Sequence, residues 1–287
     1  MGTRSLIYHD AHRLSTTGST RGTAYRFSNK SVAIGECTHV VWLDAVATVC
    51  SATWDSENGE WSESRRLFDG CDNHTSPAIT VDADGRIHLL YGPYGFWGGW
   101  NQGRFKHRVS VEPNDSTLWH DETDVGYCAT YPSITHTSEG LDVIAYRGGE
   151  APWQVMVQRQ RKTGAWSSAQ PIIGEDLEPQ YTHLGAWVHA TYNSGRRNTV
   201  LFLGAHLYAK ERENSRGVVL FRSDDLGDSW CDVSGTPVET PTRYHDAVMI
   251  PHPTPGRFCG VAADPDGNPW VLTATKDTGN PAVLLSR

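Results

Sequence analysis

Residues 71–100 read CDNHTSPAITVDADGRIHLLYGPYGFWGGW. Two short β-rich runs, at 78–81 and 87–91, are joined by DADG at 82–85, a tight-turn sequence whose glycine takes a positive φ without steric cost. A polar cluster precedes this pair of runs, and a segment rich in glycine and aromatic residues follows it at 92–100. The stretch therefore predicts a β-hairpin that presents polar and aromatic side chains at one end.

The same order of strand, tight turn and strand recurs along the chain. Copies cover residues 31–43, 77–91, 132–146 and 258–273, and a looser copy covers 186–208. A third β-rich run follows most of these pairs, at residues 47–54, 154–160, 217–222 and 281–285. Groups of three or four antiparallel strands that repeat every roughly 50 residues are typical of β-propeller blades.

We therefore expect an all-β propeller of antiparallel four-stranded blades, folded as a single domain over residues 1–287. Five blades can be counted, and up to seven could form because residues 186–258 are long enough to hold another. The last repeat ends after its third strand, so residues 23–27 are expected to supply the fourth and close the ring. A β-sandwich is the alternative, whereas the lack of a 3.6-residue periodicity argues against crossover helices.

Composition narrows the classes of partner. The chain contains 28 Gly, 11 Trp and 11 Tyr with only 20% charged residues, which favours a turn-rich β protein. Its net charge of -8 and the lack of a basic run argue against nucleic acid as the main partner. No window approaches the length of apolar sequence that a membrane helix needs, so we expect no membrane partner. We also expect a monomer in solution.

The N-terminus and the cysteines bear on the cellular compartment. Residues 1–18 lack the apolar core of a secretory signal, so the protein is expected to be cytoplasmic, or secreted or periplasmic if a signal has been removed. The cysteines are spread singly without a Cys-x-x-Cys pair, at positions 37, 50, 71, 128, 231 and 259. They are expected as buried free thiols, with one or two disulfides as the alternative.

One turn carries a specific motif. Residues 223–230 read SDDLGDSW and fit the pattern Ser/Thr-x-Asp-x-Gly-x-x-Trp, the Asp-box or BNR motif, by which the chain resembles sialidase-like propellers. The Asp225 carboxylate can accept hydrogen bonds from turn amides, Gly227 supplies a positive φ, and Trp230 can pack between blades. The motif indicates the fold and not the chemistry.

Candidate site residues lie at equivalent edges of two successive repeats. Tyr131 lies at the start of one repeat, and His74 lies at the equivalent start of the previous repeat. Arg147 lies at the end of the second strand of its repeat, and the segment that contains Tyr94 follows the equivalent strand of the previous repeat. Equivalent positions in successive blades converge on the same mouth of the central channel of a propeller. We therefore expect these four side chains to face one cavity.

Four short motifs resemble a known group, the BNR-repeat propellers that include ulvan-type polysaccharide lyases and related rhamnose–glucuronate-cleaving enzymes. The motifs are DNHTSP at 72–77, DGRIH at 84–88, TYP at 130–132 and YRGG at 146–149. In those lyases a His, a Tyr and an Arg at such motifs form the active site, which implies catalytic roles for His74, Tyr131 and Arg147. The resemblance covers residues 30–170 well and the remainder only as a propeller, and Tyr94 stands at the position of a second family histidine.

The same residue types suit β-elimination from a 4-linked uronate. That reaction needs a cation to neutralise the carboxylate, a base to remove the C5 proton, and an acid to protonate the departing O4. Arg147 offers a planar cation, Tyr131 could act as base with its pKa lowered by Arg147, and His74 could share the acid and base work. The expected substrate is an anionic, ulvan-like polysaccharide or oligosaccharide, and the reaction requires no cofactor.

Other residues are expected to bind sugar or metal. We assign sugar contacts to a group around the hairpin, namely Asn73, Tyr94, Trp97 and Trp100. His88 alternates with apolar neighbours and is expected to lie in the core or between blades. A structural zinc or calcium ion could be present, and two thiols and two imidazoles offer a zinc ligand set, Cys231, His245, His252 and Cys259.

Two other functions stay open. One is a glycoside hydrolase of the same superfamily that releases rhamnose from glucuronate, and the other is a non-catalytic carbohydrate-binding propeller in which Tyr131 and Arg147 only pack. A sialidase proper is disfavoured because no set of arginines at equivalent blade edges is visible.

Overall fold

The computed structural model of the protein describes residues 12–22, 28–69, 76–92, 101–149, 153–174, 185–192, 199–208, 215–232, 234–243, 256–264, 267–275 and 283–286. Within these ranges the regular structure is β-strand, apart from 3-10 turns at η1 (Ala45–Ala47) and at residues 101–103. No helix in the described part of the chain is long and apolar enough to cross a membrane.

The strands form five sheets that follow the order of the chain. Sheet 1 contains β1 (Ser31–Ile34), β2 (Cys37–Asp44), β3 (Thr48–Asp55), β4 (Glu60–Trp61) and β5 (Arg65–Asp69). Sheet 2 contains β6 (Ala78–Val81), β7 (Ile87–Tyr91), β8 (Phe105–Val109) and β9 (Thr123–Val125). Sheet 3 contains β10 (Thr130–His136), β11 (Asp142–Gly148), β12 (Gln154–Arg159), β13 (Gln170–Gly174) and, paired parallel to β13, β19 (Thr242–Arg243).

The C-terminal half forms the other two sheets. Sheet 4 contains β14 (Gly185–Tyr192), β15 (Thr199–Tyr208), β16 (Ser215–Ser223), β17 (Trp230–Cys231) and β18 (Pro237–Val238). Sheet 5 contains β20 (Gly256–Ala263), β21 (Pro269–Thr275) and β22 (Val283–Ser286). The described parts of residues 186–258 therefore add strands to sheets 3, 4 and 5 instead of forming a further blade.

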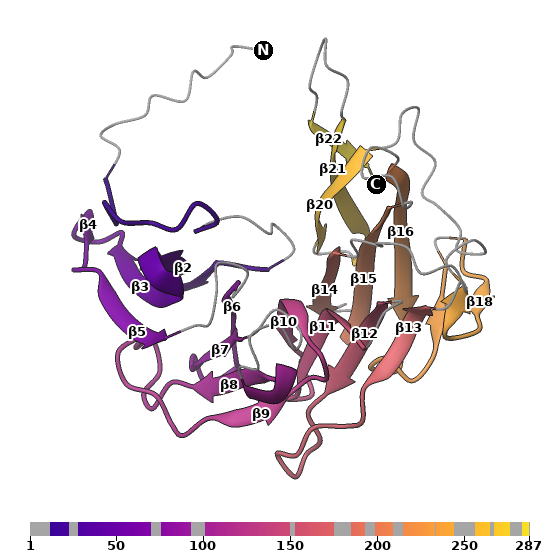
Figure 1. Ribbon diagram of the computed structural model, residues 1–287, viewed down its shortest axis with the longest axis horizontal. Helices are drawn as coiled ribbons and strands as arrows, with labels where there is room; N and C mark the ends of the chain where they lie inside the picture. Colours follow the sequence, from indigo (N-terminus) through magenta and orange to yellow (C-terminus); the bar gives the residue numbers. More distant parts are fainter. Residues whose placement is uncertain are drawn as a thin grey trace.

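The sheets are arranged as the blades of a propeller. Figure 1 shows them in chain order around an arc, from sheet 1 in indigo to sheet 5 in yellow. The first strands of successive sheets contact one another, β1 with β6, β6 with β10, β10 with β14 and β14 with β20. This arrangement confirms the predicted all-β propeller, whereas the closing strand predicted at residues 23–27 lies outside the described residues.

Alternation along the strands explains how the sheets stack. Successive side chains of a strand point to opposite faces of the sheet. In β11, Val143 and Ala145 pack against sheet 4, while Ile144 and Tyr146 pack against sheet 2. Similar apolar clusters fill the seam between sheets 1 and 2 and the seam between sheets 4 and 5. The core is therefore a series of apolar layers, one between each pair of neighbouring sheets.

The outer face of sheet 1 is covered by residues 12–22. Leu14 packs against the apolar cluster that contains Trp42. The His12 ring stacks on Trp61 with ring centroids 6.2 Å apart, and the amide of Ser19 donates a hydrogen bond to the carbonyl of Leu43 over 3.1 Å. This segment therefore shields a face that would otherwise be apolar and open.

The predicted turn chemistry is present. Asp82 accepts hydrogen bonds at Oδ1 from the amides of Asp84 and Arg86, and Gly85 takes a φ of 82°. In the Asp box, Asp225 Oδ1 accepts hydrogen bonds from the Ser223 hydroxyl and the Ser229 amide. These contacts close both turns, as the sequence predicted.

The remaining Asp-box residues also take the positions that the motif predicted. Gly227 has a φ of 92°, and Trp230 is 3% exposed in the seam between sheets 3 and 4. The motif therefore both closes a turn and anchors one sheet to its neighbour.

Two further predictions concern buried groups. His88 is 6% exposed and faces Asp142 of sheet 3, which confirms it as a histidine between blades. Burial raises the pKa of Asp142, but its close contacts with three histidines and the charge of His88 hold that pKa well below its ordinary value. Free thiols are found at the cysteines whose side chains the structure describes, Cys37, Cys50, Cys128 and Cys231.

Replacing Trp230 with alanine tests the role of the Asp-box anchor. Trp230→Ala should lower the free energy of unfolding by roughly 3–5 kcal/mol, because it leaves a cavity between two sheets. Urea denaturation followed by circular dichroism measures the change. Leu118→Ala is the control, since Leu118 is 59% exposed and its removal should cost less than about 0.5 kcal/mol. An equally small loss for Trp230→Ala would contradict the anchoring role.

Candidate active site

Tyr131 and Arg147 lie together at one end of sheet 3. The register of β10 and β11 places Thr130 opposite Arg147, and an irregularity follows between Thr130 and Ser133. Tyr131 within this irregularity has a φ of 57°, a left-handed conformation that is strained for a bulky residue. Such distortions re-aim a side chain at a strand end. The guanidinium carbon of Arg147 lies 4.7 Å from the centre of the Tyr131 ring.

A second aromatic ring fixes the orientation of Arg147. The guanidinium carbon lies 4.2 Å from the centre of the Trp153 ring, and Arg147 as a whole is 1% exposed. A cation held against aromatic faces and away from water gains more from this contact than an exposed one. Because a guanidinium donates hydrogen bonds within its own plane, the rings also set the directions in which Arg147 donates.

The two glycines after Arg147 are required by close packing. A Cβ on Gly148 would lie 2.5 Å from Cε2 of Tyr146 and 2.9 Å from the carbonyl oxygen of Tyr127. Gly149 has a φ of 82° and donates its amide hydrogen to the Tyr127 carbonyl over 3.2 Å. The Arg-Gly-Gly sequence therefore lets the strand end lie directly against the segment that leads into Tyr131.

Residues 28–30 join the first strands of three sheets near the same end. The Ser28 hydroxyl donates a hydrogen bond to the carbonyl of Pro132 over 2.5 Å. The Lys30 amine donates one to the equivalent carbonyl of the previous repeat, that of Pro77, over 2.8 Å. The amide of Ile79 donates a hydrogen bond to the backbone carbonyl of Asn29 over 2.9 Å, and the equivalent amide of Ile134 donates to Oδ1 of Asn29 over 3.5 Å. The amide of Val41 in sheet 1 donates to the backbone carbonyl of Lys30. The segment thus makes matching contacts with two neighbouring repeats.

Lys30 is a candidate site residue that sequence reasoning missed. Its amine donates hydrogen bonds to the Ser76 hydroxyl over 2.6 Å and to the Pro77 carbonyl, with no carboxylate in either contact. Desolvation lowers the pKa of Lys30 to about 7. The amine can therefore exchange a proton near neutral pH. It lies at the start of β6, the position that corresponds to Tyr131 at the start of β10.

A groove of about 530 Å³ lies between sheets 1 and 2, at the end of β7 that corresponds to the Arg147 end of β11. Phe68 and Tyr91 form part of its lining, with stacked rings 5.0 Å apart. Arg108 and Lys106 also line it and form ion pairs with Glu122. Aromatic side chains with a few polar groups beside them are typical of the lining of ligand-binding pockets.

Most of the other predicted site residues lie outside the described residues. This holds for His74, Asn73, Tyr94, Trp97 and Trp100, and for His245 and His252 of the predicted zinc set. Cys231 is half-buried, and its thiol donates to the Arg222 carbonyl over 3.5 Å, while the side chain of Cys259 is not described. The structure thus brings Tyr131 and Arg147 together, and the other assignments stay predictions.

The chain matches a family by sequence. A family profile described as BNR repeat-containing family member covers residues 37–284. Among curated proteins, an ulvan lyase from Nonlabens ulvanivorans is 22% identical over 226 residues, which are 70% of this chain and 47% of that protein. An ulvan lyase from Alteromonas sp. (strain LOR) is 29% identical over 116 residues, 34% of this chain and 24% of that protein. The chain spans less than half the length of these curated relatives.

A solved structure supports the fold. An ulvan lyase of a new polysaccharide lyase family, bound to -[GlcA(1-4)Rha3S]-, superposes with a TM-score of 0.75 at 15% sequence identity. The match covers 96% of this chain and 72% of that chain. At this identity the likeness establishes a shared propeller architecture.

The buried amine gives a prediction about pH. The folded-state pKa of Lys30 is about 7, below the roughly 10.4 of an unfolded chain, so the unfolded state binds more protons between these values. Stability should therefore rise with pH through that window. The free energy of unfolding of wild type relative to Lys30→Met should increase from pH 6 to pH 9, as measured by urea denaturation at each pH. A constant difference would show that Lys30 keeps an ordinary pKa.

Proposed function

Because this chain belongs to the BNR repeat-containing family, whose profile covers most of it, we propose that it is a polysaccharide lyase that cleaves a uronate-containing anionic polysaccharide by β-elimination. The contact between Arg147 and Tyr131 at the end of sheet 3 carries the proposal. The relatives named ulvan lyases support the choice of a lyase over a hydrolase. The expected substrate class is glucuronate in 1-4 linkage to a sulfated rhamnose, since that unit is bound in the related structure.

The two side chains divide the reaction between them. Arg147 pairs with the uronate carboxylate and stabilises the negative charge that grows on it as the C5 proton leaves. Tyr131, as a phenolate favoured by the neighbouring cation, removes that proton. The C5 electron pair forms the C4=C5 double bond, and the C4–O4 bond breaks with its electrons on O4. The Tyr131 hydroxyl then protonates O4, so the residue returns to its starting state.

Other residues complete the proposed site. His74, which resembles the active-site histidine of such lyases, would share the acid and base work or hold the carboxylate. The groove at Phe68 and Tyr91 would extend the polymer-binding surface across sheets 1 and 2. Its cations form ion pairs with carboxylates, and the uronate itself is assigned to Arg147 because the motif at 146–149 resembles that of the lyases.

Removing one oxygen atom from Tyr131 tests the enzyme assignment. Tyr131→Phe keeps the ring beside Arg147 but deletes the group that carries the proton. Turnover, followed by the ultraviolet absorbance of the conjugated 4,5-unsaturated product, should fall by about 10²-fold or more with unchanged folding. Near-normal turnover would show that Tyr131 only packs. If the wild type binds uronate polymers but never forms the unsaturated product, the protein is a carbohydrate-binding propeller.

The charge at Arg147 is tested separately. Arg147→Lys keeps a cation but loses the planar pair of donors, so kcat and binding should both fall, and Arg147→Ala should be worse. Arg161→Ala is the matched control, because Arg161 is an exposed arginine in the turn between β12 and β13 of the same sheet. Wild type should cleave the uronate polymer and ignore the same polymer after carboxyl reduction. Equal cleavage of both polymers would contradict recognition of a carboxylate.

A further inference from the structure

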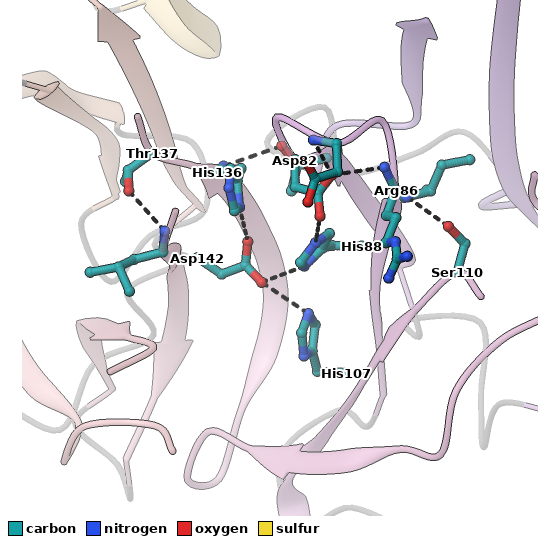
Figure 2. A network of polar contacts seen from close by, with 12 residues as sticks. Asp82, Arg86, His88, His107, Ser110, His136, Thr137 and Asp142 are labelled. Carbon is teal, nitrogen blue, oxygen red and sulfur yellow. Dashed lines mark hydrogen bonds and ion pairs between the residues drawn. The ribbon is translucent and has the colours of Figure 1, made fainter. Parts of the chain in front are cut away.

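Polar side chains interrupt the apolar seam between sheets 2 and 3 (Figure 2). They come from four strands, His88 on β7, His107 on β8, His136 on β10 and Asp142 on β11. Each lies two positions from an apolar residue of the same seam, namely Leu90, Phe105, Ile134 and Ile144. Because side chains two positions apart share a face, all four point into one buried layer.

The three imidazoles surround a single carboxylate. Asp142 Oδ2 lies 2.5 Å from Nδ1 of His88 and 3.2 Å from Nε2 of His107, while Oδ1 lies 2.8 Å from Nδ1 of His136. Asp142 is fully buried and His107 is 3% exposed. Although it lies close to the carboxylate, Nε2 of His107 makes no hydrogen bond of acceptable geometry within the described part of the chain.

A buried carboxylate is costly unless a positive charge accompanies it, and either a protonated imidazole or a metal ion can supply that charge. The described side chains whose nitrogen atoms contact Asp142 are the three imidazoles, with no lysine or arginine among them. One donor atom each from His88, His107 and Asp142 lies within 4.8 Å of the other two. Two imidazole nitrogens and a carboxylate oxygen form a ligand set that divalent zinc takes in proteins.

We propose that His88, His107 and Asp142 bind a zinc ion between sheets 2 and 3, through Nδ1, Nε2 and Oδ2 respectively. Ligand atoms around tetrahedral zinc lie about 3.3 Å apart, which matches the contact between His107 and Asp142. The shorter contact of His88 with Asp142 has to open by less than about 1 Å as the ion replaces the proton between them. Water takes the fourth position, as in other zinc sites with three protein ligands.

The surrounding carboxylate and imidazole fit the supporting roles of such a site. Nε2 of His88 lies 3.4 Å from Oδ2 of Asp82, so the ring nitrogen that faces away from the ion has a carboxylate partner (Figure 2). His136 occupies Oδ1 of Asp142 and leaves Oδ2 for the ion. Metal-binding histidines and carboxylates are commonly oriented by partners of this kind.

The position of the ion makes its role structural. Asp142 and Arg147 lie at opposite ends of β11, five residues and roughly 17 Å apart. The ion would therefore join sheets 2 and 3 away from the proposed active site, with ligands that come from both sheets. Zinc binding and lyase activity can accordingly be tested independently.

Calorimetry on the full chain tests the proposal. Protein stripped of metal with a chelator is titrated with Zn²⁺, and the stoichiometry is compared with that of His107→Ala and Asp142→Asn. Wild type should bind one more ion per chain than either variant, and saturating zinc should raise its Tm by roughly 5 °C or more. His120→Ala, which removes an exposed histidine, is the matched control and should bind zinc as wild type does. Identical stoichiometry and affinity in wild type and His107→Ala would overturn the proposal.

X-ray absorption on zinc-loaded wild type keeps the test decisive if a variant fails to fold. A first shell of nitrogen and oxygen with two imidazoles supports the site. A first shell that contains sulfur would assign the bound zinc to cysteines and would overturn the proposal, as would the lack of any zinc binding by wild type.

Discussion

The central strands of sheet 3 are buried on both faces, because sheet 2 packs on one side and sheet 4 on the other. Alternate residues of β11 and β12 serve the two seams, so Val155 and Val157 face sheet 4 while Met156 faces sheet 2. Burying both faces supplies the main stabilising term of the fold. It also shields the seams from bulk solvent, so a polar group placed there needs a partner in the protein or a bound water or ion.

This constraint divides sheet 3 into two functional ends. At the Asp142 end the strands place four polar residues in the buried seam, where they contact one another and form the proposed zinc site. At the Arg147 end the regular pairing breaks, and an irregularity and glycines replace it. The proposed active site therefore lies where the pairing of β10 with β11 is irregular, and irregularities of this kind are common next to active sites.

The packing of Arg147 links stability to the proposed function. The rings of Tyr131 and Trp153 hold the guanidinium in one orientation, and the strained backbone at Tyr131 is maintained by the two strands around it. Substrate binding therefore meets a cation whose direction is already set, which lowers the reorganisation needed as charge develops. Residues 28–30 add a fixed contact between the repeat that contains Pro77 and the repeat that contains Tyr131.

Local patterns in the sequence were sufficient to predict the propeller, most strand positions, the turn at 82–85, the Asp box and the proximity of Tyr131 to Arg147. Strands and turns could be predicted because period-two alternation and turn residues depend only on a few neighbouring residues. The proximity of Tyr131 and Arg147 could be predicted because the repeats show which positions are equivalent. β8 was missed because the three central residues of its sequence, FKHRV, are polar or charged, which is typical of an exposed segment. Lys30 and the partners of Asp142 could not be found in this way. His88 and Asp142 are 54 residues apart, and only the stacking of two sheets decides which polar side chains meet in a seam, because that stacking sets their distance and their desolvation.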